Sequence, residues 1–188
     1  MMRRKRLRLV GFDYSSPNAY FLTICAKDRA SFFGDISNGA MCVNRFGRVV
    51  QECWNDLPGH YSSIQMDVFV VMPNHVHGII FIVEPVGSIH ESTLPKTIRE
   101  RRAMLLPKIV GRFKMNSAKR INELRGTPGL SVWQRNYFEH IVRNDKSLNH
   151  IREYIATNPE RWQYDKENVD VNVNDEFSKW PITKGHQR

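Results

Sequence analysis

The 188-residue sequence has little cysteine and no long apolar run. Its cysteines, Cys25, Cys42 and Cys53, are odd in number and lack CxxC spacing, which excludes a disulfide framework and a zinc ribbon. No apolar stretch reaches the length of a signal peptide or of a membrane span. We therefore expect no membrane partner and place the protein in a reducing cytoplasm.

Acidic residues are scarce relative to basic ones. The chain has 28 Lys and Arg against 19 Asp and Glu, a formal charge of +9. Such an excess favours polyanionic partners such as nucleic acid or anionic lipid, but solubility alone would explain it as well. The hydrophobic content of 41% suits one compact domain, with no repeat and no second domain.

Four segments have the composition of strands. Residues 19–27 are rich in aromatic and β-branched residues, and residues 130–142 form a similar run. Between 64 and 84, two nearly all-apolar runs flank the turn dipeptide Pro73-Asn74, which predicts two adjacent antiparallel strands. Because these runs carry few polar residues, we expect both strands to be central and buried.

Three segments have helical periodicity. The first covers 44–61 and ends at Pro58-Gly59, and the second begins at Pro107, since proline suits a first helical position. The third covers 146–158, where Asn144 or Asp145 is the expected cap.

The predicted order is strand, helix, strand, strand, helix, strand, helix. It indicates an α+β fold, a ferredoxin-like or RRM-like split βαββαβ unit with a central antiparallel sheet, helices mainly on one face and an appended C-terminal helix. We divide the chain into a basic N-terminal arm (1–18), the domain (19–162), with a mobile loop at about 85–106, and a polar tail (163–188) with little to bury.

Two histidines stand at the head of the second strand of the central pair. His75 and His77 are two residues apart, so their side chains are expected on one face of the sheet, with Ile79 and Phe81 beyond them. Imidazole is a good ligand for divalent ions, but two ligands are too few, and structural histidines are an open alternative. Gly78 favours a close approach by a ligand or another backbone.

The last predicted helix carries polar groups beside its apolar stripe. Tyr154 and Asn158 are four residues apart on one shoulder of the stripe formed by Leu148, Ile151 and Ile155. Both could turn toward the sheet. A tyrosine that packs its ring and exposes its hydroxyl to water is the alternative from this helix alone.

Taken together, these segments resemble a known family. The stretch "MPNHVHGII", followed by "VWQRNYFEHIVRNDKSLNHIREYIATNPERW", is similar to the HUH single-tyrosine transposases, in particular the REP-associated tyrosine transposases. The stretches "YFLTICAKDRASFFGD" and "IVGRFKMNSAKRIN" resemble the same branch. The likeness covers about residues 20–162, with the elements in the family order.

The resemblance implies a role for each matching residue. His75, His77 and Asn158 would bind a divalent metal, Mg²⁺ or Mn²⁺, and Tyr154 would be the nucleophile. Related insertion-sequence transposases have glutamine at the position of Asn158, so the shorter asparagine departs from the pattern. Tyr137 is the other candidate nucleophile. It lies on the predicted fourth strand, which favours a structural role over a catalytic one.

The implied reaction is cleavage and rejoining of single-stranded DNA at hairpin-associated, REP-like sites through a 5′-phosphotyrosine. Four basic residues are our candidates for DNA backbone contacts: Arg112, Lys114, Lys119 and Arg135. The oligomeric state is open, because related transposases form homodimers, whereas this branch is compatible with a monomer. A noncatalytic single-strand-binding module and a metal-dependent phosphodiesterase without a covalent intermediate are the alternatives.

Overall fold

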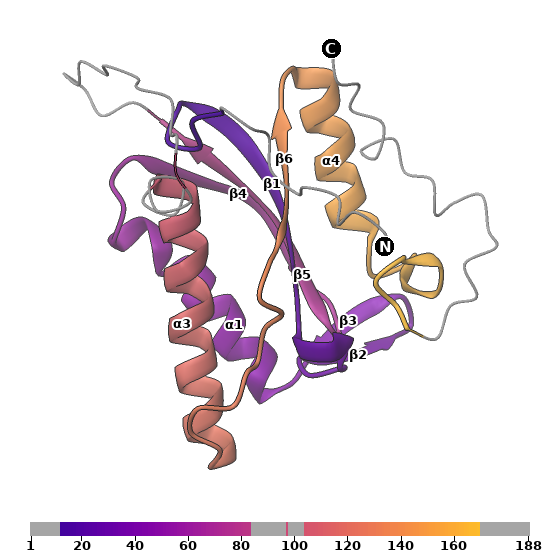
Figure 1. Ribbon diagram of the computed structural model, residues 1–188. Helices are drawn as coiled ribbons and strands as arrows, with labels where there is room; N and C mark the ends of the chain where they lie inside the picture. Colours follow the sequence, from indigo (N-terminus) through magenta and orange to yellow (C-terminus); the bar gives the residue numbers. More distant parts are fainter. Residues whose placement is uncertain (1–11, 84–96, 98–103, 170–188) are drawn as a thin grey trace, which may run out of the picture.

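The computed structural model describes residues 12–83, 97 and 104–169 (Figure 1). The basic run of the N-terminal arm, nearly all of the predicted loop at 85–106, and the tail beyond 169 lie outside these residues. Within the described part of the chain, no helix is long and apolar enough to cross a membrane.

A four-stranded antiparallel sheet forms the centre of the molecule. Its strands are β1 (Asn18–Cys25), β4 (Ile64–Val71), β5 (His75–Ile82) and β6 (Phe138–Val142), in the spatial order β4-β5-β1-β6. Strands β1 and β5 occupy the middle and are buried on both faces, as expected for β5. The same expectation is wrong for β4, which lies at the edge of the sheet and is mostly half-buried, because among the described strands it pairs with β5 alone. The predicted α+β architecture is confirmed.

Two helices pack against one face of this sheet. They are α1 (Arg45–Asn55), capped by the Asn44 side chain, and α3 (Leu105–Arg125), which ends at Gly126 in a left-handed conformation. Figure 1 shows both on the same side of the strands. A two-stranded hairpin, β2 (Gly34–Ser37) and β3 (Ala40–Val43), lies between β1 and α1 in sequence.

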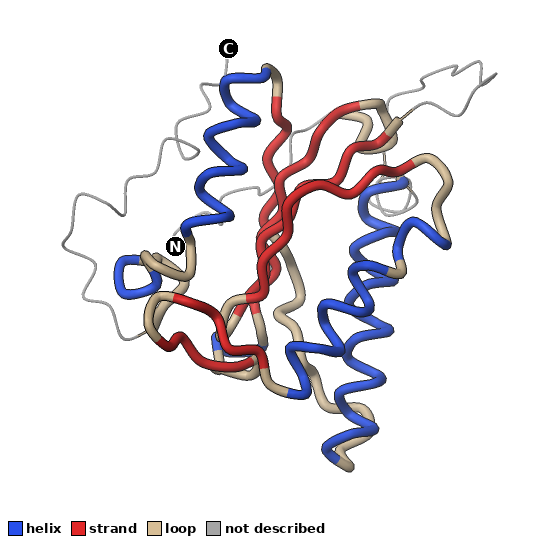
Figure 2. Tube along the Cα trace, turned by 180° about the vertical axis from the view of Figure 1, so that it is seen from behind, coloured by secondary structure: helices blue, strands red, loops and turns tan. Residues whose placement is uncertain are grey.

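The opposite face carries α4 (Asp145–Thr157), as Figure 2 shows from behind. Asn144 caps this helix by accepting a hydrogen bond from the Ser147 backbone N–H, as predicted. Ile151 and Ile155 are buried against Phe21 and Ile79 of the sheet. The sheet therefore separates two apolar clusters, and α4 is the helix that faces the His75–His77 side.

Two predicted boundaries are wrong. Helix α3 begins at Leu105, two residues before Pro107, which is tolerated because N–H groups of a first helical turn have no acceptor within the helix. Strand β6 begins only at Phe138, because the segment before it contacts β1 through a single bridge between Trp133 and Ala26. Tyr137 thus precedes the strand on which it was expected.

Gly78 has a packing role that explains its place in a central strand. A Cβ atom there would lie 2.4 Å from Cζ2 of Trp54 and 3.0 Å from Cδ2 of Phe69. The two aromatic rings are stacked, with centroids 4.4 Å apart. Glycine therefore admits the Trp54 ring of α1, on the face opposite His77. The group that approaches Gly78 closely is this side chain and not a ligand.

Candidate metal and tyrosine site

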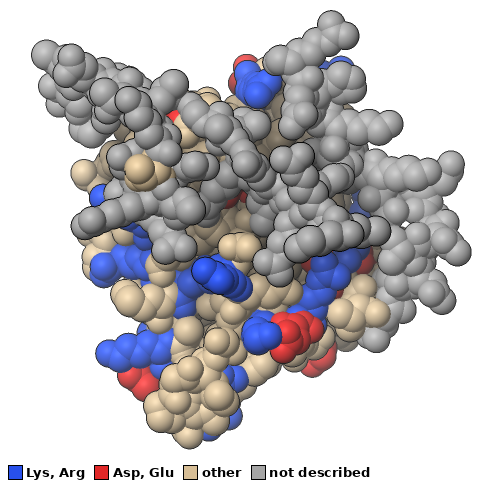
Figure 3. Space-filling view, in the orientation of Figure 1, with Lys and Arg blue, Asp and Glu red and all other residues tan. Residues whose placement is uncertain are grey.

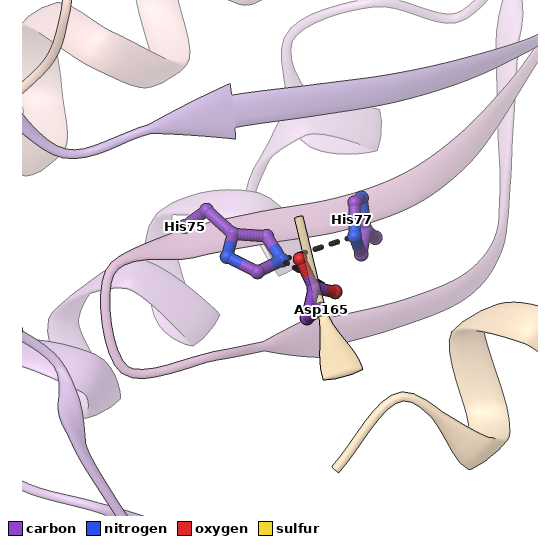
Figure 4. Close-up of side chains that lie close together, drawn as sticks. All are labelled: His75, His77 and Asp165. Atoms are coloured by element: carbon purple, nitrogen blue, oxygen red, sulfur yellow. Dashed lines mark hydrogen bonds and ion pairs between the residues drawn. The ribbon is translucent and has the colours of Figure 1, made fainter. Parts of the chain in front are cut away.

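The two histidines of β5 point to the same face of the sheet, as the alternation predicts. Both are 0% exposed, and their Nε2 atoms lie 3.0 Å apart (Figure 4). Thr23 on the neighbouring strand β1 pairs with His77, and its hydroxyl lies 2.9 Å from His77 Nδ1. The two rings are thus held by backbone register and by contacts on their outer nitrogens.

Asn74 fixes the tautomer of His75. Its amide nitrogen donates to the carbonyl oxygens of Arg29 and Glu167, at 3.1 and 2.7 Å, so its Oδ1 faces the ring. His75 Nδ1 lies 2.8 Å from that oxygen and must be the donor, since an amide oxygen only accepts. In the neutral ring, Nε2 of His75 therefore carries a lone pair directed at His77.

Asp165 completes the cluster on the side away from β5. Its side chain is 1% exposed, and its Oδ2 lies 4.0 Å from Nε2 of His75. The ligand atoms of His75, His77 and Asp165 all lie within 4.8 Å of one another. A buried carboxylate without a cation is costly, so this arrangement favours a positive ion between the three groups.

The spacing of the histidines fits a bound divalent ion. Two ligands about 2.1 Å from one ion and at a right angle are about 3.0 Å apart, which is the separation of the two Nε2 atoms. Two imidazoles and a carboxylate are also a common donor set for divalent ions. The residues present therefore fit a divalent metal ion.

Tyr154 projects from α4 into the same cluster. Its hydroxyl lies 3.2 Å from Nε2 of His77 and donates a hydrogen bond to Asp165 Oδ2 at 3.5 Å. The ring contacts Phe21 edge-on, with centroids 6.1 Å apart. The structure thus brings together the histidine pair and the tyrosine that the sequence placed 77 positions later. Tyr137 precedes β6 and packs against the other apolar cluster.

Asn158, the third metal ligand implied by the resemblance, contacts the carboxylate of Asp165. Its amide nitrogen donates to Asp165 Oδ2 at 2.7 Å, and the side chain is 2% exposed. Its Oδ1 is buried and has no hydrogen-bond partner among the described residues. Asn158 therefore holds the carboxylate in place, and its orphaned amide oxygen can accept a further donor or cation.

Burial sets the protonation of the site in the absence of an ion. It lowers the pKa of His75 and His77, because an imidazolium is poorly solvated there. Burial raises the pKa of Tyr154, and the negative charges of Asp165 and Glu167 raise it further. The metal-free site thus holds neutral imidazoles and a neutral phenol, and a cation is needed to favour the tyrosinate.

The sequence did not indicate Asp165. It lies just after the short 3-10 helix η3 (Trp162–Tyr164), in the segment predicted to have little to bury. That expectation is wrong for Asp165 and Glu167, which are 6% and 9% exposed. Glu167 forms an ion pair with Arg29 at 2.9 Å, which ties the segment to the residues after β1. No periodicity signals such a contact in a polar stretch.

The predicted DNA-contacting residues lie apart from this cluster. Arg112, Lys114 and Lys119 are on α3, across the sheet from Tyr154, and Lys114 donates to the carbonyl oxygens of Gln134 and Arg135. Figure 3 shows basic side chains gathered over the part of the surface formed by α3 and the segment before β6. The four predicted residues therefore lie on α3 and on the segment before β6, and not at the histidine pair.

Comparison with curated proteins gives two relatives from Haemophilus influenzae. One, described as an uncharacterized protein, is 39% identical over 176 residues, which cover 89% of this chain and 94% of the relative. The chain therefore belongs to the same family as this uncharacterized relative. The other is a putative REP-associated tyrosine transposase, 25% identical over 176 residues that cover 93% of this chain and 84% of the relative.

Solved structures give more distant matches. A REP-associated tyrosine transposase bound to a REP hairpin matches with a TM-score of 0.48 and 18% identity, over 88% of this chain and 77% of the other. A putative transposase from Deinococcus radiodurans matches with a TM-score of 0.44 and 17% identity, over 82% and 96% of the two chains. No model of a known protein family matches the chain.

Proposed function

The chain resembles the REP-associated tyrosine transposases, as its motifs predict and its curated relative confirms, and on this premise we propose that it is a DNA strand transferase. It would cleave and rejoin single-stranded DNA in the cytoplasm at hairpin-associated sites. The single observation that carries the proposal is the convergence of the Tyr154 hydroxyl on the buried His75, His77 and Asp165 cluster.

His75 and His77 would hold a divalent ion, Mg²⁺ or Mn²⁺, through their Nε2 atoms. The third ligand would be Asp165, because its oxygen already faces His75 and a charged carboxylate binds such ions better than a neutral amide. Asn158 would orient that carboxylate, with its own Oδ1 as a further donor. When bound, the ion would neutralise charge on a DNA phosphate and favour the tyrosinate.

Tyr154 would attack the phosphorus in line with the leaving oxygen. The phenol oxygen forms the new O–P bond, the bond from phosphorus to the 3′ oxygen breaks, and the 3′ oxygen takes up a proton. Because His77 and Asp165 would both be engaged as ligands, the phenol proton would pass to water. The phosphotyrosine retains the diester energy, so a free 3′-hydroxyl can later reverse the step.

The basic residues of α3 would bind DNA away from the cleavage point. Lys114 is adjacent to Arg135, and Arg112 lies beside His60, 2.9 Å from its Nε2. We propose that Arg112, Lys114, Lys119 and Arg135 contact backbone phosphates of a hairpin stem. Binding should then weaken with salt, with a logarithmic slope of about −0.7 to −0.9 for each phosphate neutralised.

The test is incubation with Mn²⁺ and a labelled hairpin that carries a single-stranded flank, followed by denaturing electrophoresis. A protein–DNA adduct that resists denaturation and is absent with EDTA supports the proposal. Hydrolysed DNA without an adduct would instead indicate a phosphodiesterase that activates water. Binding without cleavage would indicate a noncatalytic single-strand module.

A further inference from the structure

A bulge in β4 turns two consecutive side chains toward α4. The register between β4 and β5 shifts between Met66 and Phe69, so Asp67 and Val68 together oppose one residue of β5. In a regular strand Val68 would share the face of Met66. Instead Met66 packs in the cluster on the α1–α3 side, and Val68 packs in the cluster that contains Ile151. Bulges commonly re-aim a side chain in this way.

The other residue of the bulge, Asp67, binds α4. Nε of Arg152 donates to Asp67 Oδ2 at 2.7 Å, and the Asp67 side chain is only 17% exposed. Nη1 of Arg152 also donates to Oδ1 of Asn149, one turn earlier on the same helix. Arg152 is two residues before Tyr154, so this polar contact anchors the turn of α4 that carries the tyrosine.

The other contacts of α4 with the sheet are mainly apolar. Ile151 and Ile155 pack on Phe21 and Ile79, and such contacts fix the distance of the helix from the sheet better than its rotation. A charge-assisted hydrogen bond is directional, so it specifies the rotation and the position along the axis. A displacement of about 1 Å at a nucleophile can slow a reaction by about a hundredfold.

We infer that Asp67 and Arg152 are positioning residues that lock α4 to the sheet of its own chain. The phenol of Tyr154 is thereby held beside His75 and His77 of the same chain. The inference rests on the proposed function for its effect on cleavage, but the contact itself is independent of it.

Three variants test the positioning role. Asp67→Asn and Arg152→Gln remove the ion pair, whereas Arg152→Lys keeps the charge. The matched control is Glu52→Gln, because the Glu52–Arg120 pair likewise joins two elements, α1 and α3, on the far side of the sheet. All variants are measured with Mn²⁺ and saturating hairpin DNA in single-turnover adduct formation, together with the Kd for DNA.

We expect Asp67→Asn and Arg152→Gln to slow adduct formation about tenfold. Their Kd for DNA should stay within about twofold of wild type, since the pair lies away from the proposed DNA contacts. Arg152→Lys should recover most of the rate, and Glu52→Gln should leave it unchanged. If Asp67→Asn is no slower than Glu52→Gln, the positioning role is wrong.

Same-chain action has its own test. A Tyr154→Phe protein mixed with a His75→Ala/His77→Ala protein should give no adduct, because neither chain has both halves of the site. An adduct from the mixture would show that α4 serves a partner and would overturn the inference.

Hydrogen exchange separates this inference from the proposed function. If the wild-type protein forms no adduct, the proposed function fails, but the exchange of α4 backbone amides still reports the contact. Faster exchange across α4 in Asp67→Asn than in Glu52→Gln would support the anchor. Equal exchange in the two variants would refute it.

Discussion

The phenol oxygen of Tyr154 lies 3.2 Å from Nε2 of His77, although the two residues belong to a helix and a strand that are far apart in the sequence. Each side chain alone has an ordinary structural explanation. Their meeting in a buried site, with a carboxylate beside them, does not, because a core gains nothing from burying these polar groups without a function or an ion.

Metal binding should depend on the two histidines. At a concentration about 100 times its Kd, Mn²⁺ should stabilise the wild-type protein by about 2.7 kcal/mol, seen as a rise in Tm. His77→Ala should weaken Mn²⁺ binding at least about tenfold in calorimetry. His60→Ala, a histidine outside the cluster, should bind as wild type, and an equal loss in both variants would argue against the site.

Asp165 should matter more for the ion than Asn158 does. Asp165→Asn removes the charge of the proposed third ligand and should weaken Mn²⁺ binding at least about tenfold. Asn158→Ala should weaken it less, because it removes only the orienting hydrogen bond and one neutral oxygen. Titration calorimetry of both variants decides between them, with Asp28→Asn as an exposed control. If Asn158→Ala weakens Mn²⁺ binding more than Asp165→Asn does, Asn158 is the third ligand.

The metal-free protein should lose stability as the pH falls below about 6.5. Burial lowers the pKa of His75 and His77, so at lower pH the unfolded chain binds more protons than the folded chain. The loss begins near the unfolded pKa of about 6.5 and grows toward the lower pKa values of the folded state. Urea denaturation in EDTA at two pH values, 7.5 and about 5.5, measures it.

The control for this pH dependence is a pair of substitutions. His75→Gln/His77→Gln should show a smaller fall in unfolding free energy between the two pH values than wild type. His60→Gln should keep the full fall, because His60 is exposed and lies outside the buried cluster. A double variant with an undiminished pH dependence would contradict the assignment.

Gly78→Ala should destabilise the fold by about 1–3 kcal/mol, because the new methyl group must displace the Trp54 ring. Gly111→Ala is the matched control. Gly111 is exposed on α3 with no heavy atom within 4 Å of its Cβ position, and the change should stabilise by up to about 1 kcal/mol. Chemical denaturation of both proteins checks the difference, and similar stabilities would refute the packing role of Gly78.

Local periodicity was enough to predict much of the site. The period of two on β5 placed His75 and His77 on one face, and the helical spacing placed Tyr154 and Asn158 on one shoulder of α4. Each of these inferences needs only the geometry of a single element.

Features that depend on contacts between elements were not predictable. Asp165 follows η3 in a polar stretch, and only its return to the sheet brings it to the histidines. The bulge at Asp67 lies in a run that reads as a regular buried strand, since the extra residue shows only in its pairing with β5. The late start of β6 likewise reflects its partner strand rather than its composition.

The most direct test of the central claim is to locate the DNA on the protein. Trypsin cleaves after Arg152 and Arg161, so Tyr154 lies in the peptide 153–161, and Tyr137 lies in the separate peptide 136–143. After nuclease digestion of the adduct, mass spectrometry should find a phosphonucleotide on peptide 153–161, and Tyr154→Phe should abolish the adduct. A modified peptide 136–143, or an adduct that survives Tyr154→Phe, would contradict the account.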